Sequence, residues 1–417
     1  MVSAAFTPAF RLVVACVHWP PTPARTRAVA QAATHAALDW QEVHTLAVRN
    51  RIAGLVVHAL ATATVRPPES VQRALAAQAQ RDAQGNLRLL NSALVLVRAC
   101  ADAGIVARVL KGPALVTHLY GSPMQRQCKD VDLLVDEDDV AGAARVCHGL
   151  GYVPQFPPPT CPERLIPLWL RWHKDLVFTH PSWGQLELHV RPAPCPLLSR
   201  RLDLPAGLGE VPLAPGVTLP TVLGETLYAY LCWHGACSRW RRLKWLADLA
   251  ALTDPLDAST LETWHASARR RGVGRASGLA LLLLQELFGR ELPHGVREEV
   301  HGDRMLPALL RASLRVIVAP IPSHPSVWDR VTGLAYQLLM IEAWSSRWRD
   351  MQALFMDWPL LLRLPWLQRG AQWWLRRWPE SRGGPPLVLA SPLFMLAKIV
   401  RRCRRLMARP PGRAAAG

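Results

Sequence analysis

Three absences narrow the class of this 417-residue sequence before any motif is considered. Its nine cysteines include no C-x-x-C pair, which is typical of reduced thiols rather than of a disulfide framework. No apolar run reaches the roughly 20 residues needed to span a bilayer; the longest late run, Leu387–Val400, contains Pro392 and Lys398. The opening apolar stretch, Leu12–Val17, is short and follows no basic segment, so we expect no signal peptide. Together these absences predict a cytoplasmic protein.

Acidic residues are also scarce relative to basic ones. Lys and Arg number 49 against 31 Asp and Glu, a net charge of +18. Residues 361–417 hold 12 of these basic residues and one acid, Glu380, and eight of the 17 tryptophans lie between Trp328 and Trp378. Basic and aromatic residues together stack on bases or lie at lipid headgroups. This region is therefore expected to meet nucleic acid or an anionic membrane surface, peripherally at the inner face; the alternative is a solvated tail.

The composition that is present is globular. Half of the residues are hydrophobic, 19% are charged, and the length predicts two or three domains. Residues 1–103 are expected to form a helical region, because the spacing is helical from Thr26 to about Cys100 and includes one long helix from Glu69 to Ala103 that Gly104 ends. Residues 104–200 alternate short strands and helices, 201–327 are expected to be helical, and 328–417 form the Trp/Arg-rich region. The expected strands are 105–110, 131–135, 152–153, 176–178 and 186–190, with a proline-dense loop over 154–167.

The most informative stretch is LKGPALVTHLYGSPMQRQCKDVDLLV, from Leu110 to Val135. Asp130 and Asp132 are two residues apart on an expected strand, so their side chains point to the same face. A third carboxylate on a neighbouring strand would complete an oxygen cage for Mg²⁺, and Glu187 lies in such a strand, LELHV. Alone, D-x-D is a weak signal, because acids at strand ends are usually only solvated. The glycine turn before it and the apolar strand after it strengthen the interpretation.

In this context the stretch resembles the nucleotidyltransferases of the DNA polymerase β-like superfamily, which share a glycine turn, a D-x-D strand and a later single carboxylate. It is similar, more narrowly, to a family of largely uncharacterised bacterial nucleotidyltransferases. The resemblance covers about residues 30–260. Its matching positions are Leu110-Lys111-Gly112, Ala114-Leu115, Leu119-Tyr120, Arg126, Asp130 to Val135, Gly151-Tyr152, Glu187-Leu188-His189, Leu231, His234 and Leu243 to Asp248.

The resemblance implies an α+β fold, in which a polymerase β-like core of small mixed sheet and helices is embedded in helical N- and C-terminal regions. It implies that Asp130, Asp132 and Glu187 are the catalytic residues and the ligands of Mg²⁺ or Mn²⁺, with Glu187 activating the acceptor hydroxyl. Gly112 would let the backbone approach the triphosphate closely, where a Cβ would obstruct it. The candidate nucleotide- or phosphate-binding residues are Lys111, Gly112, Arg126, His189, His234 and Lys244.

Several of these residues have a second interpretation. Pro113 departs from the superfamily pattern of Gly or Ser at the turn, since it offers phosphate neither a hydroxyl nor an N–H. Lys111 and Arg126 then become candidates to supply positive charge, although each also fits as a salt-bridge partner of the acidic cluster. Lys244 and Asp248, one helical turn apart, either line the pocket or form an i, i+4 ion pair.

The function implied by the resemblance is transfer of a nucleoside monophosphate from an NTP to an acceptor hydroxyl, with release of pyrophosphate. The acceptor stays open among RNA, a protein or peptide, and a small molecule. One alternative is a toxin-type nucleotidyltransferase that modifies tRNA 3′ ends and has a neutralising partner. Another is a non-catalytic nucleotide-binding protein that retains the fold, which is disfavoured because all three carboxylates are present.

Overall fold

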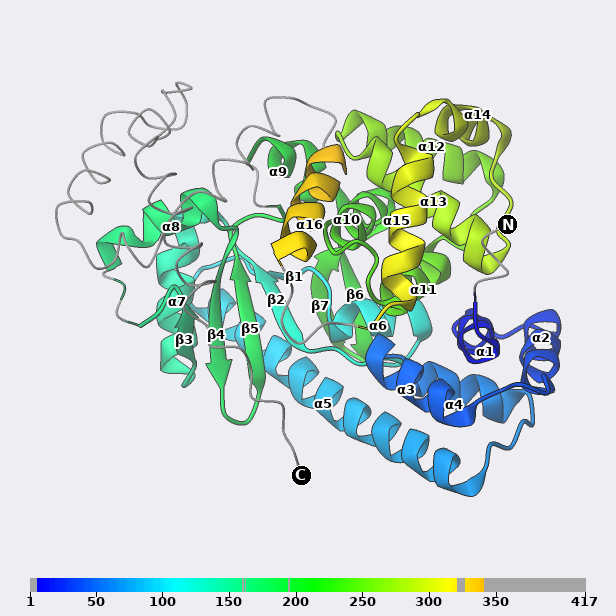
Figure 1. Ribbon diagram of the computed structural model, residues 1–417. Helices are drawn as coiled ribbons and strands as arrows, with labels where there is room; N and C mark the ends of the chain where they lie inside the picture. The colour runs from blue at the N-terminus through cyan, green and yellow to red at the C-terminus, as the bar shows by residue number, and fades with distance from the viewer. Residues whose placement is uncertain (1–5, 160, 162, 194–195, 321–326, 341–417) are drawn as a thin grey trace, which may run out of the picture.

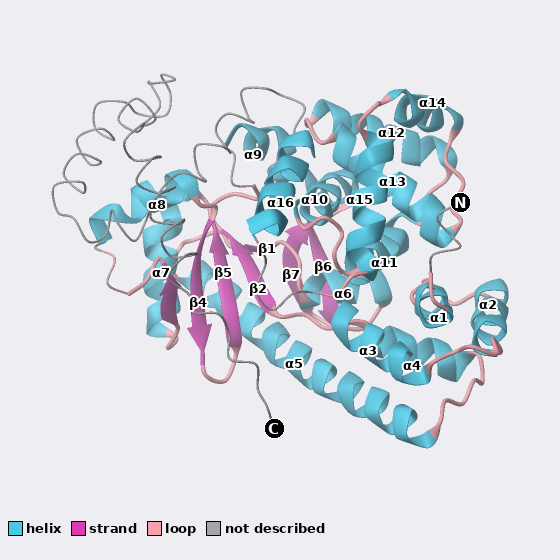
Figure 2. Ribbon diagram, in the orientation of Figure 1, coloured by secondary structure: helices cyan, strands magenta, loops and turns pink. Residues whose placement is uncertain are grey.

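The computed structural model describes residues 6–159, 161, 163–193, 196–320 and 327–340 of the chain. These residues form an α+β fold in which a seven-stranded mixed sheet is flanked by helices (Figure 2). The fold class predicted from the sequence is confirmed. Most of the predicted Trp/Arg-rich region, including its basic residues 361–417, lies outside the described residues.

The sheet has the strand order β3-β4-β5-β2-β1-β7-β6. Its centre pairs β2 with β5 in parallel, so two strands far apart in sequence run side by side. Strand β1 is antiparallel to β2 and parallel to β7, and thereby joins the two halves of the sheet. The remaining neighbours are antiparallel. The strands are β1 Arg108–Val109, β2 Asp130–Leu134, β3 Val153–Phe156, β4 Asp175–His180, β5 Gly184–His189, β6 Leu208–Ala214 and β7 Val217–Val222.

Helices α1 to α5 precede the first strand, and α1 lies before Thr26, where the helical spacing of the sequence begins. The last of them has 34 residues and runs as a long diagonal beside the sheet (Figure 1). It ends where Gly104 takes a positive φ of 74°, the left-handed conformation that glycine adopts without strain. These helices are α1 Pro8–Cys16, α2 Pro23–Ala33, α3 Trp40–Asn50, α4 Ala53–Thr62 and α5 Glu69–Asp102.

Later helices cover the sheet and form a helical group after β7 (Figure 1). Predicted helices beginning near residues 114, 140, 221, 241, 259 and 275 are confirmed, with ends that shift by a few residues. None of the helices in the described ranges is long and apolar enough to cross a bilayer. The helices are α6 Pro113–Tyr120, α7 Val140–Gly149, α8 Ile166–Trp172, α9 Pro196–Leu202, α10 Gly224–Cys237, α11 Leu243–Thr253, α12 Ala258–Arg270, α13 Gly274–Phe288, α14 His294–Gly302, α15 Leu306–Val318 and α16 Val327–Met340.

The structure differs from the sequence-based expectation in two places. The stretch 201–327, expected to be helical, begins with the hairpin of β6 and β7, which extends the sheet beyond β1. The proline-dense stretch 154–167 is only partly a loop, because β3 occupies its start and α8 begins before its end. Pro167 lies in the first turn of α8, where its missing N–H costs no helical hydrogen bond.

Two buried asparagines attach the N-terminal helices to the rest of the fold. The side-chain oxygen of Asn50, at the end of α3, accepts the N–H of Leu243, the first residue of α11, at 2.8 Å. On α5, Asn86 accepts the N–H of Cys128 at 2.8 Å and donates to the carbonyl of Arg126 at 2.7 Å. The start of α11 and the loop that leads into β2 are therefore both positioned by the N-terminal helices.

Candidate active site

Asp132 and Glu187 lie directly opposite each other on the parallel strands β2 and β5. On each strand the alternate residues are apolar and buried: Val131 and Leu133 on β2, and Leu188 on β5, have no exposed surface. Because side chains alternate across a strand, burying this apolar set presents the acids to the opposite face of the sheet. The strand pairing alone thus brings together two carboxylates that are 55 positions apart.

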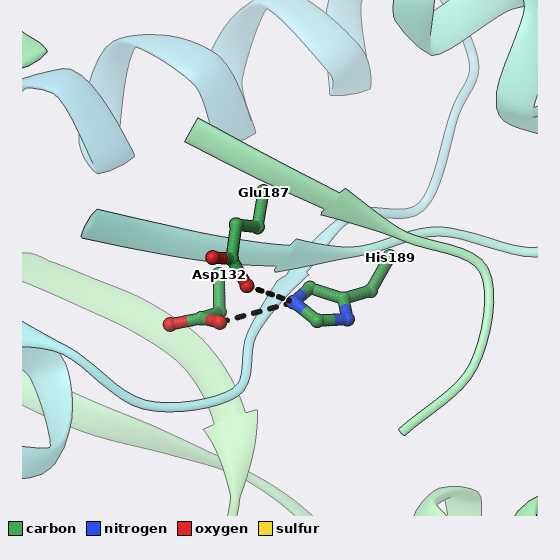
Figure 3. A group of neighbouring side chains, drawn as sticks. All are labelled: Asp132, Glu187 and His189. Carbon is green, nitrogen blue, oxygen red and sulfur yellow. Dashed lines mark hydrogen bonds and ion pairs between the residues drawn. The ribbon is translucent and has the colours of Figure 1, made fainter. Parts of the chain in front are cut away.

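His189 completes a compact group with these two acids (Figure 3). Its Nε2 lies 3.0 Å from Asp132 Oδ1 and 3.4 Å from Glu187 Oε2. One possible ligand atom from each of the three residues lies within 4.8 Å of the others. We refer to Asp132, Glu187 and His189 as the carboxylate centre. Two carboxylates and an imidazole form a donor set that can hold a divalent metal ion.

The two oxygens of Asp132 differ in their partners. The side chain has no exposed surface, and its Oδ1 accepts from Lys111 Nζ at 2.5 Å and contacts His189. Its Oδ2 is buried and has no hydrogen-bond partner among the described residues. Leaving a buried carboxylate oxygen without a partner costs free energy, and a cation bound to this oxygen would remove that cost. The residues around Asp132 therefore fit a bound cation.

The charges around Asp132 shift its pKa strongly. Burial alone would raise the pKa of this carboxyl, but the Lys111 ammonium and the His189 hydrogen bond outweigh burial and hold it well below its usual range. Burial and Lys174 would lower the pKa of His189, yet its bonds to Asp132 and Glu187 leave it raised. The centre is therefore built to keep Asp132 ionised.

Asp130 lies on the same face of β2, two residues before Asp132, but outside the three-residue group. Burial and the nearby charge of Asp132 raise its pKa, and among the described residues no cation lies within 4 Å of its carboxylate. Its interaction with Asp132 shows that the two carboxylates are electrostatic neighbours. The three predicted metal ligands thus share one face of the sheet, while His189 lies closer to Asp132 and Glu187 than sequence reasoning expected of a phosphate-binding residue.

Gly112 forms the turn between β1 and α6. Its φ of +77° is a conformation that side-chain-bearing residues rarely adopt, and an added Cβ would lie 3.0 Å from the carbonyl oxygen of Asp130. Pro113 follows as the first residue of α6, where its fixed φ suits a helix start. Lys111 is therefore held beside β2 by a turn that requires glycine.

Arg126 forms a buried ion pair, but with Asp248 rather than with the acidic cluster. Its Nε lies 2.7 Å from Asp248 Oδ1, which also accepts from the Tyr120 hydroxyl at 3.0 Å. The pair joins the loop before β2 to α11. Of the two interpretations of Arg126, the structure supports a salt bridge, with a partner that the sequence analysis had assigned to Lys244.

One comparison with known proteins identifies the family. Residues 36–289 match the family described as uncharacterised nucleotidyltransferase. The chain belongs to this family. The match covers more than half of the sequence and includes the whole carboxylate centre, β1 to β7, and α3 to α13 up to its end. No curated protein sequence matches the chain.

In this nucleotidyltransferase family member, Lys244 does not form the i, i+4 ion pair with Asp248 that was one of its two interpretations. The residue is 8% exposed, and among the described residues no carboxylate oxygen lies within 4 Å of its Nζ. Burial lowers its pKa to about 7, helped by the nearby charges of Arg126 and Arg51. Burial also lowers the pKa of His234 well below 6.5, and Lys111 adds to that effect, so this imidazole is neutral near pH 7.

The sequence analysis missed Lys174 and Asp175, at the start of β4. Lys174 Nζ lies 2.7 Å from Asp175 Oδ2, 3.2 Å from His189 Nδ1 and 3.7 Å from Glu187 Oε2. Burial would raise the pKa of Asp175, but Lys174 and His189 outweigh it and lower that pKa. Lys174 lies two residues before the predicted strand 176–178, and this position is the only sequence signal for its role.

Proposed function

We propose that this protein transfers a nucleoside monophosphate from an NTP to an acceptor hydroxyl, with Mg²⁺ or Mn²⁺ as cofactor and a DNA polymerase β-like core. One observation carries the proposal: in a chain of a nucleotidyltransferase family, two acids stand in register on adjacent parallel strands, and one of them has a buried oxygen without a partner. A bound divalent ion would neutralise charge on the phosphates and lower the pKa of the attacking hydroxyl.

The residues proposed as metal ligands are Asp130, Asp132 and Glu187. Three carboxylates are the oxygen donors that Mg²⁺ prefers. His189 then acts on the ligands themselves: its Nε2 contacts one oxygen of Asp132 and one of Glu187 and fixes their orientation. A set of Asp132, Glu187 and His189 would instead favour a metal that accepts nitrogen, such as Mn²⁺ or Zn²⁺.

In the proposed reaction the acceptor oxygen bonds to the α-phosphorus of the NTP. The bond between the α-phosphorus and its bridging oxygen to the β-phosphate breaks, and pyrophosphate leaves. The hydroxyl proton passes to Glu187, whose carboxylate is partly exposed and therefore reachable by the acceptor. Lys111, Gly112 and the amides that follow Pro113 in α6 are proposed to contact the α-phosphate, since an N-terminal helix end favours anions.

A labelling experiment tests this function. Purified protein is incubated with each α-³²P-labelled NTP, Mg²⁺ or Mn²⁺, and lysate fractions that contain RNA, protein or small molecules. We expect label to enter one fraction, and the Asp130→Ala/Asp132→Ala variant to lose that transfer. The matched control is Asp136→Ala/Asp138→Ala, which removes two exposed acids just beyond β2. Equal labelling by both double variants would exclude a role for the strand acids.

The ligand set is tested separately by Mn²⁺ binding, measured by the electron paramagnetic resonance signal of free Mn²⁺. If Asp130 is a ligand, Asp130→Asn should weaken binding by about tenfold or more, while His189→Asn should weaken it less. The opposite order would assign the metal to Asp132, Glu187 and His189. Identification of tRNA as the labelled acceptor would favour the toxin-type alternative; metal and NTP binding without transfer to any fraction would favour a binding protein.

A further inference from the structure

A second charged cluster lies beside the carboxylate centre, at the junction of α3 and α11. The end of α3 carries Arg51, and the start of α11 carries Arg242 and Lys244. The two segments are hydrogen-bonded to each other through Asn50 and Leu243, and Arg242 also donates to the carbonyl of Arg49 at 2.9 Å. We call Arg51, Arg242 and Lys244 the cationic site.

The backbone holds Arg51 in place on two sides. It caps α3 in the left-handed conformation, with φ of 60°, and its carbonyl accepts the N–H of Gln127 at 3.1 Å. The start of α4 packs closely against the same loop, because a Cβ at Gly54 would lie 2.6 Å from the carbonyl oxygens of Met124 and Gln125. Arg51 therefore lies in a turn between α3 and α4 that is packed closely against the loop before β2, and not in a free loop.

The cations of the cationic site form no ion pair with a described residue. The nearby acid Asp248 is already bonded to Arg126, and Asp82 receives a hydrogen bond from Gln78. Asp130 acts electrostatically on Arg51 and Lys244 but forms an ion pair with neither. Among the described residues, no carboxylate lies within 4 Å of Arg51, Arg242 or Lys244. Burial lowers the pKa of Arg51, and burial together with neighbouring arginines lowers the pKa of Arg242 to about 10. Like charges held this close are destabilising unless an anion joins them.

The start of α11 adds to the positive field. The helix begins without a side-chain cap, so its dipole is uncompensated there. Lys244, in its first turn, is more than nine-tenths buried and has no partner among the described residues. Asp130 lies within electrostatic reach of both Lys244 and Arg51. The cationic site thus adjoins the end of β2 that carries a proposed metal ligand.

We propose that Arg51, Arg242 and Lys244 bind the β- and γ-phosphates of the nucleoside triphosphate and hold the pyrophosphate as it leaves. The inference rests on the proposed function for the identity of the ligand, while the cationic site itself is a feature of the fold. It extends the substrate site to the N-terminal helices, which contribute Arg51 and position Arg242 and Lys244. A phosphate chain carries several charges on adjacent groups, which suits three cations better than a single carboxylate does.

Calorimetric titration of the full chain with inorganic tripolyphosphate, in EDTA and again in Mg²⁺, tests the inference. The variants Lys244→Met and Arg51→Gln should each weaken binding by about tenfold or more, since each removes a charge-assisted contact. Arg88→Gln, an exposed position on α5, is the matched control and should bind as the wild type does. Arg51→Gln alters a partly exposed side chain, so it remains informative if Lys244→Met does not fold.

Two results separate this inference from the proposed function. Asp132→Asn should abolish transfer yet keep tripolyphosphate binding in EDTA, and binding without any transfer activity would leave the cationic site standing while the function falls. Conversely, transfer with an unchanged KM for NTP in Lys244→Met and Arg51→Gln would overturn the cationic site and leave the function. Failure of the wild type to bind tripolyphosphate in both conditions would also overturn it.

Discussion

The carboxylate centre and the cationic site lie near each other at β2 but differ in the charges that surround their buried ionised groups. Asp132 is a buried anion whose charge is matched by Lys111 and His189 within 3.0 Å. Lys244 is a buried cation with no carboxylate within 4 Å among the described residues. The protein places two cations beside Asp132 but leaves its Oδ2 without a partner, whereas it places no carboxylate within ion-pair distance of the second site among the described residues. We therefore expect a cation to bind at the first site and an anion at the second.

The largest effect is expected from a substitution in the carboxylate centre. Asp132→Asn keeps the shape of the side chain and removes its charge, so we expect the transfer rate to fall about 10³-fold. The rate is measured with labelled NTP under single-turnover conditions. Glu137→Gln, at an exposed position three residues after β2, should leave it unchanged. A fall of less than tenfold for Asp132→Asn would remove the carboxylate centre from the reaction.

The next effect concerns the buried ion pair of Arg126 and Asp248. Arg126→Met leaves Asp248 buried without its cation, and we expect the free energy of unfolding to fall by about 3–5 kcal/mol. Urea denaturation followed by circular dichroism measures it. Arg126→Met/Asp248→Leu should recover most of the loss, and Arg73→Met, which breaks only an exposed pair with Glu69, should change little. Equal losses in the single and double variants would argue against the pair.

A smaller effect of opposite sign is expected at Lys244. Its pKa is about 7 in the folded state, against a usual value of 10.5, so the unfolded state binds more protons between these pH values. This group therefore destabilises the fold fully below pH 7 and progressively less as the pH rises towards 10.5. Lys244→Met should be more stable than the wild type by about 2 kcal/mol at pH 6, and nearly equal at pH 10.

Chemical denaturation of both proteins at several pH values checks this difference. Tripolyphosphate at pH 6 should stabilise the wild type more than Lys244→Met, because only the wild type retains the ammonium that the phosphate contacts. A variant that is less stable than the wild type at pH 6 would mean that Lys244 already has a stabilising partner.

The smallest effect is expected at the N-terminal cap of α3, and it tests whether Arg51 depends on the whole of this helix. Asp39 caps this helix by accepting the N–H of Gln41 at 2.8 Å, so Asp39→Ala should cost about 1 kcal/mol of stability. The cap is at the far end of α3 from Arg51, and tripolyphosphate affinity should therefore stay within about twofold. Thermal unfolding and calorimetry measure the two quantities. A large loss of affinity would show that the position of Arg51 depends on the whole of α3, and not only on the packing of the turn that contains it.

Much of the carboxylate centre could be predicted from sequence because its signals are local. The spacing of Asp130 and Asp132 gives their common face, and the apolar alternation around Glu187 gives the partner strand. The fold class, the long helix α5 and the helices after β7 follow from periodicity. The hairpin of β6 and β7 could not be predicted in this way, because Pro212, Pro215 and Pro220 interrupt its alternation.

In the cationic site only Lys244 had a signal in the sequence, as a candidate phosphate-binding residue. Arg51 follows a helix by one residue, a position where an arginine is unremarkable in a basic chain. The links from Asn50 to Leu243 and from Arg242 to the carbonyl of Arg49 bring it to the start of α11. Of the two interpretations of Lys244 and Asp248, the i, i+4 ion pair is not formed, because Arg126 binds Asp248 and the spacing alone does not show which residues compete for it. Long-range hydrogen bonds between buried polar groups decided both.

The Asn50 link also bears on how the gene can be cut. A fragment that starts at residue 104 would contain all three proposed metal ligands and the eight helices α6 to α13 of the family match, and would look complete from its motifs. It would lack Arg51, and the amide of Leu243 would lose the acceptor that anchors the start of α11. Fragments and chimaeras that keep only the motif-bearing segment would therefore retain the carboxylates without Arg51 and without the hydrogen bond that positions Lys244.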